Sequence, residues 1–139
     1  MTITIRANLD DVALAGLSVR AVSEFELFSQ EDAILIELAV CEALNNAIIH
    51  GLPDRPDEFV QLEIAHASDR IVFSISDCGP GMPEGIERIG YEQRISLASR
   101  GRGIAIMRDV MDSVTYERRD GRSVLKLVKR TAALAQGTT

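Results

Sequence analysis

Several features that define large classes of protein are missing from this sequence of 139 residues. It has two cysteines, Cys41 in an apolar segment and Cys78 in a glycine-rich one, which is too little for a disulfide framework. The formal net charge of −6 means that the basic excess needed for nonspecific nucleic-acid binding is absent. We therefore expect a reduced, cytoplasmic protein that does not bind nucleic acid directly.

Signals for membrane insertion or export are also lacking. Crossing a bilayer takes roughly 18 consecutive apolar residues, and Glu37 and Glu42 interrupt the best candidate. The first residues, MTITIRANLDD, lack the basic and then apolar segments of a signal peptide. With 46% hydrophobic residues and no internal repeat, residues 1–139 are expected to form one domain without membrane contact.

Hydrophobic periodicity predicts the order strand, helix, helix, hairpin, long loop, helix, hairpin. The expected elements are a strand at 2–6, a helix from a cap at Asp10 or Asp11 to about Phe28, a helix at about 30–50 capped by Ser29, strands at 59–65 and 70–77, a helix at 103–111, and strands at 113–117 and 123–129 around an Asp120-Gly121 turn.

This order indicates an α+β fold, a two-layer sandwich whose mixed, mostly antiparallel sheet is covered on one face by helices. The segment from about 82 to 102 has little regular pattern. Loops of that length in compact domains are usually lids or binding loops, so we interpret it as a lid. Residues 131–139 are expected to be a frayed tail.

The most informative segment is ELAVCEALNNAIIHG, residues 37–51, an apolar helix with polar side chains on one row. Glu42, Asn46 and His50 follow one another at helical spacing and therefore share a face. A carboxylate one turn before an amide can orient a hydroxyl while the amide oxygen holds a hard metal ion. The alternative is a helix end at the surface, with Glu42 solvated and His50 structural.

Two glycine-rich segments suggest a nucleotide ligand. In DCGPG, residues 77–81, the glycines permit close approach of a ligand, and Asp77 at the strand end can accept a hydrogen bond from an amine such as that of adenine. In RGRG, residues 100–103, free N–H groups at a helix start and two guanidiniums suit phosphates. The alternatives are a plain turn and a solvated arginine loop. Neither segment is a Rossmann or Walker A motif.

In combination, the motifs E-A-x-x-N-A-x-x-H-G, D-x-G-x-G and G-x-G, in this order, resemble the ATP-binding domain of the GHKL superfamily (the Bergerat fold). Gyrase, heat-shock chaperone, histidine-kinase and mismatch-repair ATPases share this domain. The text of the first motif looks most like the serine/threonine kinases that act as anti-sigma factors. The resemblance extends over roughly Ile3 to Lys129.

The resemblance implies a role for each matching residue. Glu42 matches the general base, Asn46 the Mg²⁺ ligand, and Asp77 the acceptor of the adenine amine. The matching glycines shape the base pocket and cover the phosphates of ATP: Gly79, Gly81, Gly101 and Gly103. On physical grounds Arg100 and Arg102 would add positive charge at those phosphates.

Three positions need separate comment. Arg20 falls where such kinases use an arginine to contact their protein partner. Relatives commonly have a threonine directly after the glycine of the last hairpin, where this chain has Arg122 after Gly121. Ser123, one residue later, is the candidate to replace the threonine hydroxyl near the adenine. Arg102 stands where many relatives have an apolar residue.

The function implied is an ATP- and Mg²⁺-dependent serine/threonine kinase that binds a sigma factor and phosphorylates a STAS-domain antagonist. The alternative is a nucleotide-gated binding module of the same fold with little or no kinase activity. A detached histidine-kinase catalytic domain would need a phosphoacceptor histidine on a helix pair, whereas His50 ends a helix and His66 lies in a hairpin. Relatives are often dimers, which leaves a homodimer open.

Overall fold

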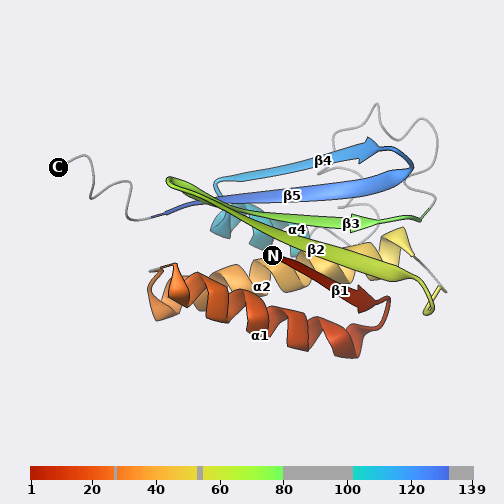
Figure 1. The fold of residues 1–139 in the computed structure, drawn as a ribbon, viewed down its shortest axis with the longest axis horizontal. Coiled ribbons are helices and arrows are strands. Elements are labelled where there is room, and N and C mark those ends of the chain that lie inside the picture. Colours follow the sequence, from red (N-terminus) through yellow and green to blue (C-terminus); the bar gives the residue numbers. More distant parts are fainter. Residues whose placement is uncertain (27, 53–54, 80–101, 132–139) are drawn as a thin grey trace.

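The computed structural model describes residues 1–26, 28–52, 55–79 and 102–131, and it shows a sheet with helices on one face (Figure 1). The elements are β1 (Thr2–Arg6), α1 (Leu9–Phe25), α2 (Gln30–Asn46), η1 (Ala47–Gly51), β2 (Phe59–Ala67), β3 (Arg70–Asp77), α4 (Arg102–Val110), β4 (Ser113–Arg119) and β5 (Arg122–Arg130). The strands form one sheet in the order β1-β2-β3-β5-β4. The predicted α+β two-layer architecture is confirmed.

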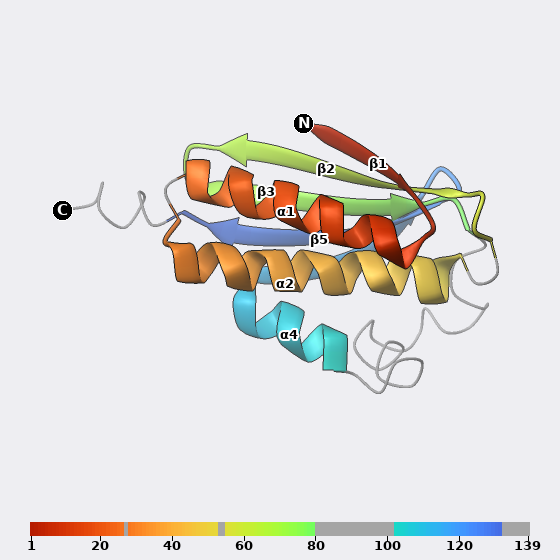
Figure 2. The same cartoon turned by 90° about the horizontal axis from the view of Figure 1, so that it is seen from below.

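All four strand pairings of this sheet are antiparallel, so the described part has no parallel pair. Along β3 the side chains of Ile71, Phe73 and Ile75 are almost fully buried, because period-two alternation turns them toward the helices. Figure 2 shows α1, α2 and α4 side by side beneath the sheet, with α2 between the other two. The core therefore lies between β3 with its neighbours and the central helix α2.

The two long helices begin at polar caps. Ser29 caps α2 as predicted, since its Oγ accepts a hydrogen bond from the N–H of Asp32 at 3.0 Å. The prediction for α1 was wrong: Asn8 is the cap, in an extended conformation, with its Oδ1 accepting from Asp10 N–H at 2.8 Å. Asp10 and Asp11 instead occupy the first turn of α1, where the positive end of the helix dipole favours carboxylates.

The central helix is not α-helical to its end. It changes at Asn46 into the π-helix η1, where the sequence predicted a regular helix to about residue 50. The wider turn of a π-helix re-aims the residues after it. A Cβ on Gly51 would lie 2.7 Å from Asp77 Oδ2, so the end of η1 rests directly on the end of β3.

The membrane prediction also needs correction. The helical stretch Gln30–Gly51 has 22 residues and mean hydropathy 1.5, which makes it long and apolar enough to cross a bilayer by length and composition. Glu37 and Glu42 do not outweigh the apolar residues around them. In the fold this stretch is the central helix of the core, and core helices commonly meet the same test.

The last hairpin closes as predicted. Asp120 and Gly121 have φ of 51° and 76°, the left-handed values that a tight two-residue turn requires. Strand β5 continues to Arg130, and the N–H of Thr131 still donates to the carbonyl of Asp69 at 3.1 Å. The lid expected at about 82–102 lies outside the described residues except for Arg102, and so does the tail from residue 132 onward.

Candidate functional site

The start of α4 lies against two polar side chains of α2. A Cβ on Gly103 would be 3.0 Å from Glu42 Oε2 and 3.5 Å from Asn46 Nδ2. Glu42 is half-buried, while Asn46 is only 9% exposed. The fold thus brings together a carboxylate, an amide and the N-terminus of a helix, as the sequence motifs had suggested.

The side-chain amide of Asn46 is buried and incompletely hydrogen-bonded. Its Nδ2 has no hydrogen-bond partner in the described part of the chain. An unsatisfied buried donor costs about 1–3 kcal/mol, and a ligand at this point would supply the missing partner. Phosphate oxygens accept from an amide N–H, and Mg²⁺ takes an amide oxygen. Together with the N–H groups that begin α4, Asn46 therefore suits a metal-bound phosphate.

A second polar group lies at the end of β3. Asp77 is 4% exposed, and its Oδ1 accepts a hydrogen bond from the N–H of Gly79 at 3.0 Å. Gly51 covers the other carboxylate oxygen so closely that a side chain there would have to displace it. A Cβ on Gly79 would overlap the carbonyl oxygen of Gly51. Two glycine backbones therefore form the wall around Asp77.

Burial raises the pKa of Asp77, while the Gly79 N–H and the charges of Arg118 and Arg122 act in the opposite direction. A buried carboxylate has about four acceptor sites, so after one hydrogen bond it can still accept from a further N–H donor. An exocyclic amine is such a donor, whereas the carbonyl that guanine carries at the same ring position is not. An acceptor of this kind can distinguish adenine from guanine.

Ser123 pairs with Asp77 across β3 and β5, and both face the helices. Its Oγ accepts hydrogen bonds from the Tyr116 hydroxyl and from Arg118 Nη1, each at 3.0 Å. A hydroxyl oxygen with two such donors has its own proton left to donate. The structure therefore places a hydroxyl donor beside the carboxylate acceptor.

Three residues around Asp77 and Ser123 were not predicted from the sequence. Gly51 was interpreted only as the end of a helix, and Tyr116 and Arg118 only as parts of a hairpin. Each becomes important through a partner that is distant in sequence, because Gly51 meets Asp77 and Arg118 meets Gly79. The alternation of β4, which sets Tyr116 and Arg118 on the same face, was the signal that could have found them.

The remaining predicted residues are placed as follows. Gly81, Arg100 and Gly101 lie outside the described residues, as does the side chain of Arg102. Arg20 lies on α1, on the far side of α2 from α4, and its guanidinium is 3.5 Å from Glu24 and 4.0 Å from Glu37. It is not part of the cluster around Glu42.

Neither cysteine has the character of a nucleophile. Burial and the charges of Glu37 and Glu42 raise the pKa of the Cys41 thiol to about 11. A hydrogen bond to Glu58 also raises the pKa of Cys78. Both thiols are free and protonated at neutral pH. Burial lowers the pKa of His50, which keeps this imidazole neutral at the end of η1.

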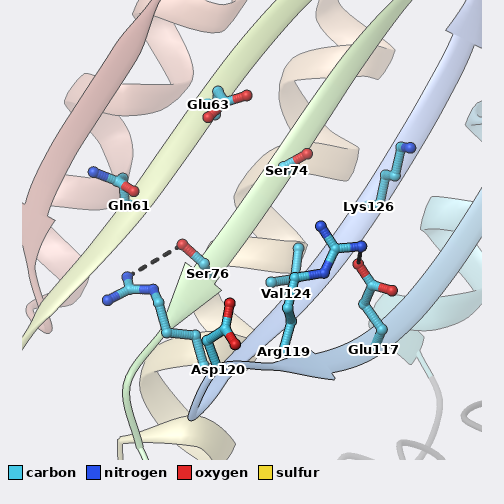
Figure 3. Close-up of a pocket in the computed structure, with 10 residues that line it drawn as sticks. Gln61, Glu63, Ser74, Ser76, Glu117, Arg119, Asp120, Val124 and Lys126 are labelled. Carbon is cyan, nitrogen blue, oxygen red and sulfur yellow. Dashed lines mark hydrogen bonds and ion pairs between the residues drawn. The ribbon is translucent and has the colours of Figure 1, made fainter.

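A separate hollow of about 320 Å³ lies on the open face of the sheet (Figure 3). Ser74 and Ser76 are short side chains in its middle, and Arg122 Nη2 donates to Ser76 Oγ at 3.2 Å. Glu63 from β2 and Lys126 from β5 stand on either side. The sheet separates this hollow from Asp77, which faces the helices, and from Glu42, which lies on α2.

Comparison with known proteins decides the family. Residues 5–129 match the histidine kinase-like ATPase domain. The chain belongs to that family. Its sequence is similar to an anti-sigma F factor of Clostridium beijerinckii, with 31% identity over 98 residues, 68% of each chain. It is also similar to an anti-sigma F factor of Oceanobacillus iheyensis, with 35% identity over 116 residues, 71% of this chain and 79% of the relative.

The fold agrees with this assignment. A histidine kinase domain from the Erythrobacter litoralis blue-light activated histidine kinase superposes with a TM-score of 0.57 at 20% sequence identity. The match covers 95% of this chain and 64% of that domain. Membership of the GHKL ATP-binding superfamily, expected from the motifs, is confirmed, and the domain implies ATP as the ligand.

Proposed function

We propose that this protein is a Mg²⁺- and ATP-dependent serine/threonine-protein kinase that acts as an anti-sigma factor. It binds a sigma factor in the cytoplasm and phosphorylates a STAS-domain antagonist. The observation that carries the proposal is the meeting of Glu42, Asn46 and the start of α4, where Gly103 lies close against the Glu42 carboxylate. The similarity to anti-sigma F factors supports the partner class.

Each part of ATP has a recognising group in this arrangement. Asp77 accepts the adenine amine, with Gly79 and Gly51 closing the pocket around it. The N–H groups at the start of α4 would bind the phosphates, and Asn46 would hold Mg²⁺ through its amide oxygen. When bound there, Mg²⁺ would supply charge neutralisation at the phosphates. Gly81, Arg100, Gly101 and Arg102 complete the phosphate contacts in this proposal.

Glu42 orients the acceptor hydroxyl and takes its proton. Phosphoryl transfer depends mainly on in-line positioning and charge neutralisation, so a carboxylate beside the metal ligand is the group needed to place the attacking oxygen. Glu42 stands one turn before Asn46 on the rigid central helix. A serine or threonine of a protein substrate brings its hydroxyl to this carboxylate from the solvent side.

The sigma factor has a surface available on α1. Leu14, Leu17 and Phe25 recur at helical spacing on the side turned away from the sheet, and they are 66%, 57% and 83% exposed. An apolar stripe of this kind on a surface helix is typical of a protein contact. Arg20 on the same helix would contribute to binding this partner. This surface is separate from Glu42, so partner docking leaves the kinase site accessible.

Intact-mass spectrometry tests the proposal. A candidate STAS-domain protein is incubated with Mg-ATP and the unaltered protein, and in parallel with a Glu42→Gln variant. The proposal expects a gain of one phosphate only with the unaltered protein, because Gln cannot accept the proton. The control is ATP binding, which Glu42→Gln retains.

Two outcomes contradict the proposal. Equal transfer by the Glu42→Gln variant would show that another group activates the acceptor. Tight ATP binding without transfer to any of the STAS-domain proteins encoded in the same genome would instead indicate the nucleotide-gated binding module.

A further inference from the structure

Arg118 occupies a position in the adenine pocket that none of the ATP-binding motifs predicts. It lies on β4 opposite Ser123 of β5, and cross-strand partners share a face, so its side chain lies on the helix-covered side of the sheet. Arg119, the next residue, points to the open face and pairs with Glu117 at 2.9 Å. Two adjacent arginines therefore have different surroundings.

The guanidinium of Arg118 binds three separate parts of the pocket. Nη1 donates to Ser123 Oγ at 3.0 Å, while Nη2 donates to the carbonyl of Gly79 at 3.2 Å and to that of Gly121 at 3.4 Å. Gly79 follows β3, whereas Gly121 belongs to the β4–β5 turn. A single planar group with several fixed donors thus joins the loop after β3 to the last hairpin.

The contact with Gly79 has a direct consequence for Asp77. Gly79 has no side chain, so its backbone has more freedom than that of any other residue type. The Arg118 contact holds its carbonyl, and the N–H of the same residue donates to Asp77 Oδ1. Both peptide groups of Gly79 are therefore held by hydrogen bonds, the carbonyl by Arg118 and the N–H by Asp77. The bond from the Gly79 N–H holds the Asp77 carboxylate in one orientation.

We propose that Arg118 is a positioning residue for ATP. It holds Gly79 and Ser123 so that the carboxylate of Asp77 and the hydroxyl of Ser123 are presented together to the adenine ring. This inference rests on ATP binding by the proposed kinase but not on phosphoryl transfer. It adds to the pocket a residue that acts through its neighbours.

The charges around Asp77 determine the pH dependence expected. Arg118 from β4 and Arg122 from β5 both lower the pKa of Asp77, against the effect of burial. The β2 partner of Asp77 is the apolar Val60, and η1 contributes the Gly51 backbone, with the neutral His50 just before it. Removing the Arg118 charge would raise the pKa of Asp77 further, so ATP binding that needs the carboxylate would be lost at a higher pH as the solution is acidified.

Isothermal titration calorimetry with ATP and with GTP, from pH 5 to pH 9, provides the test. The variants are Arg118→Met, which removes charge and contacts, and Arg118→Lys, which keeps the charge but cannot span three acceptors. Arg119→Met is the matched control on the open face. Thermal unfolding of each variant establishes that it is folded at the titration temperature.

The proposal expects Arg118→Met to bind ATP about tenfold more weakly at neutral pH and to lose preference for ATP over GTP. On acidification, its ATP binding should be lost at a higher pH than that of the unaltered protein. Arg118→Lys should recover the pH profile of the unaltered protein without recovering its affinity. Arg119→Met should behave like the unaltered protein. This separation of charge from positioning is not expected of a residue that only stabilises the hairpin.

Several results overturn the proposal. Arg118→Met binding ATP within twofold of the unaltered protein would remove the positioning role, and identical pH profiles for the Met and Lys variants would remove the charge effect. If Arg118→Met does not fold, a normal affinity and ATP preference in Arg118→Lys would overturn positioning. Failure of the unaltered protein to bind ATP would instead overturn the proposed function, and this inference with it.

Discussion

Replacing Gly103 by alanine tests whether the start of α4 forms part of the active site. The added Cβ would lie 3.0 Å from Glu42 Oε2, 3.5 Å from Asn46 Nδ2 and 3.7 Å from Glu42 Cβ. The shortest of these contacts is tighter than carbon normally makes with oxygen, so the Glu42 carboxylate must move by a few tenths of an ångström. The moving atom is the end of a flexible side chain, and no backbone atom is displaced.

The effects on stability and on activity should therefore differ. Alanine in a helix is favoured over glycine by about 0.5–1 kcal/mol, which offsets the small displacement of Glu42, and we expect an unchanged or slightly higher unfolding temperature. If Glu42 is the base, as proposed, displacing it by much less than 1 Å should reduce phosphoryl transfer about tenfold, given that a misplacement of about 1 Å costs roughly a hundredfold. Ala105→Ser, on an exposed position of the same helix, is the matched control.

Differential scanning calorimetry and single-turnover transfer to a STAS-domain substrate measure the two effects. Transfer by Gly103→Ala within twofold of the unaltered protein would refute the claim that α4 and Glu42 form one site. A fall in unfolding temperature large enough to explain the lost activity by unfolding at the assay temperature would be equally damaging. It would mean that the glycine is needed for folding and not for the ligand.

Two further changes give independent tests. Asn46→Ala should abolish the Mg²⁺ dependence of ATP binding. It should change the unfolding free energy by only about 1 kcal/mol, because Nδ2 has no partner to lose. Unfolding in urea measures this free energy, and a loss several times larger would contradict the reasoning. Because the folded-state pKa of Asp77 lies above its usual 3.8, ATP affinity should fall as the pH drops toward that raised pKa. The stability that this carboxyl contributes depends on pH in the opposite direction. It is fully present below the usual pKa of 3.8 and is lost as the pH rises through the raised pKa of the folded state. Asp77→Asn should remove both pH dependences, and a retained affinity profile would show that another group titrates.

Local signals predicted much of the fold because they act over a few residues. The Ser29 cap and the Asp120-Gly121 turn each follow from hydrogen bonding or backbone preference inside one short segment. The cap of α1 was wrong because several polar residues compete there. Asn8 prevailed in the extended conformation that follows β1, which leaves the two aspartates for the first turn.

The π-turn at the end of α2 had no visible signal in the sequence. Residues 47–51 are ordinary helix formers up to Gly51, and a regular helix would satisfy them locally. The wider turn brings Gly51 onto Asp77, which is a contact between elements far apart in the chain. Its cause is packing, and packing is not encoded in local propensity.

The sequence by itself determined the family, the α+β architecture and the residue types of the site, because helical spacing puts Glu42 and Asn46 on one face and a strand end exposes Asp77. Only the tertiary structure decided which groups meet. It placed Gly103 on Glu42, Gly51 on Asp77, and Arg118 between Gly79 and Ser123. Propensity and spacing act along the chain, whereas these contacts arise from how α1, α2 and α4 pack on a twisted sheet, and their distances exist only once that packing is complete.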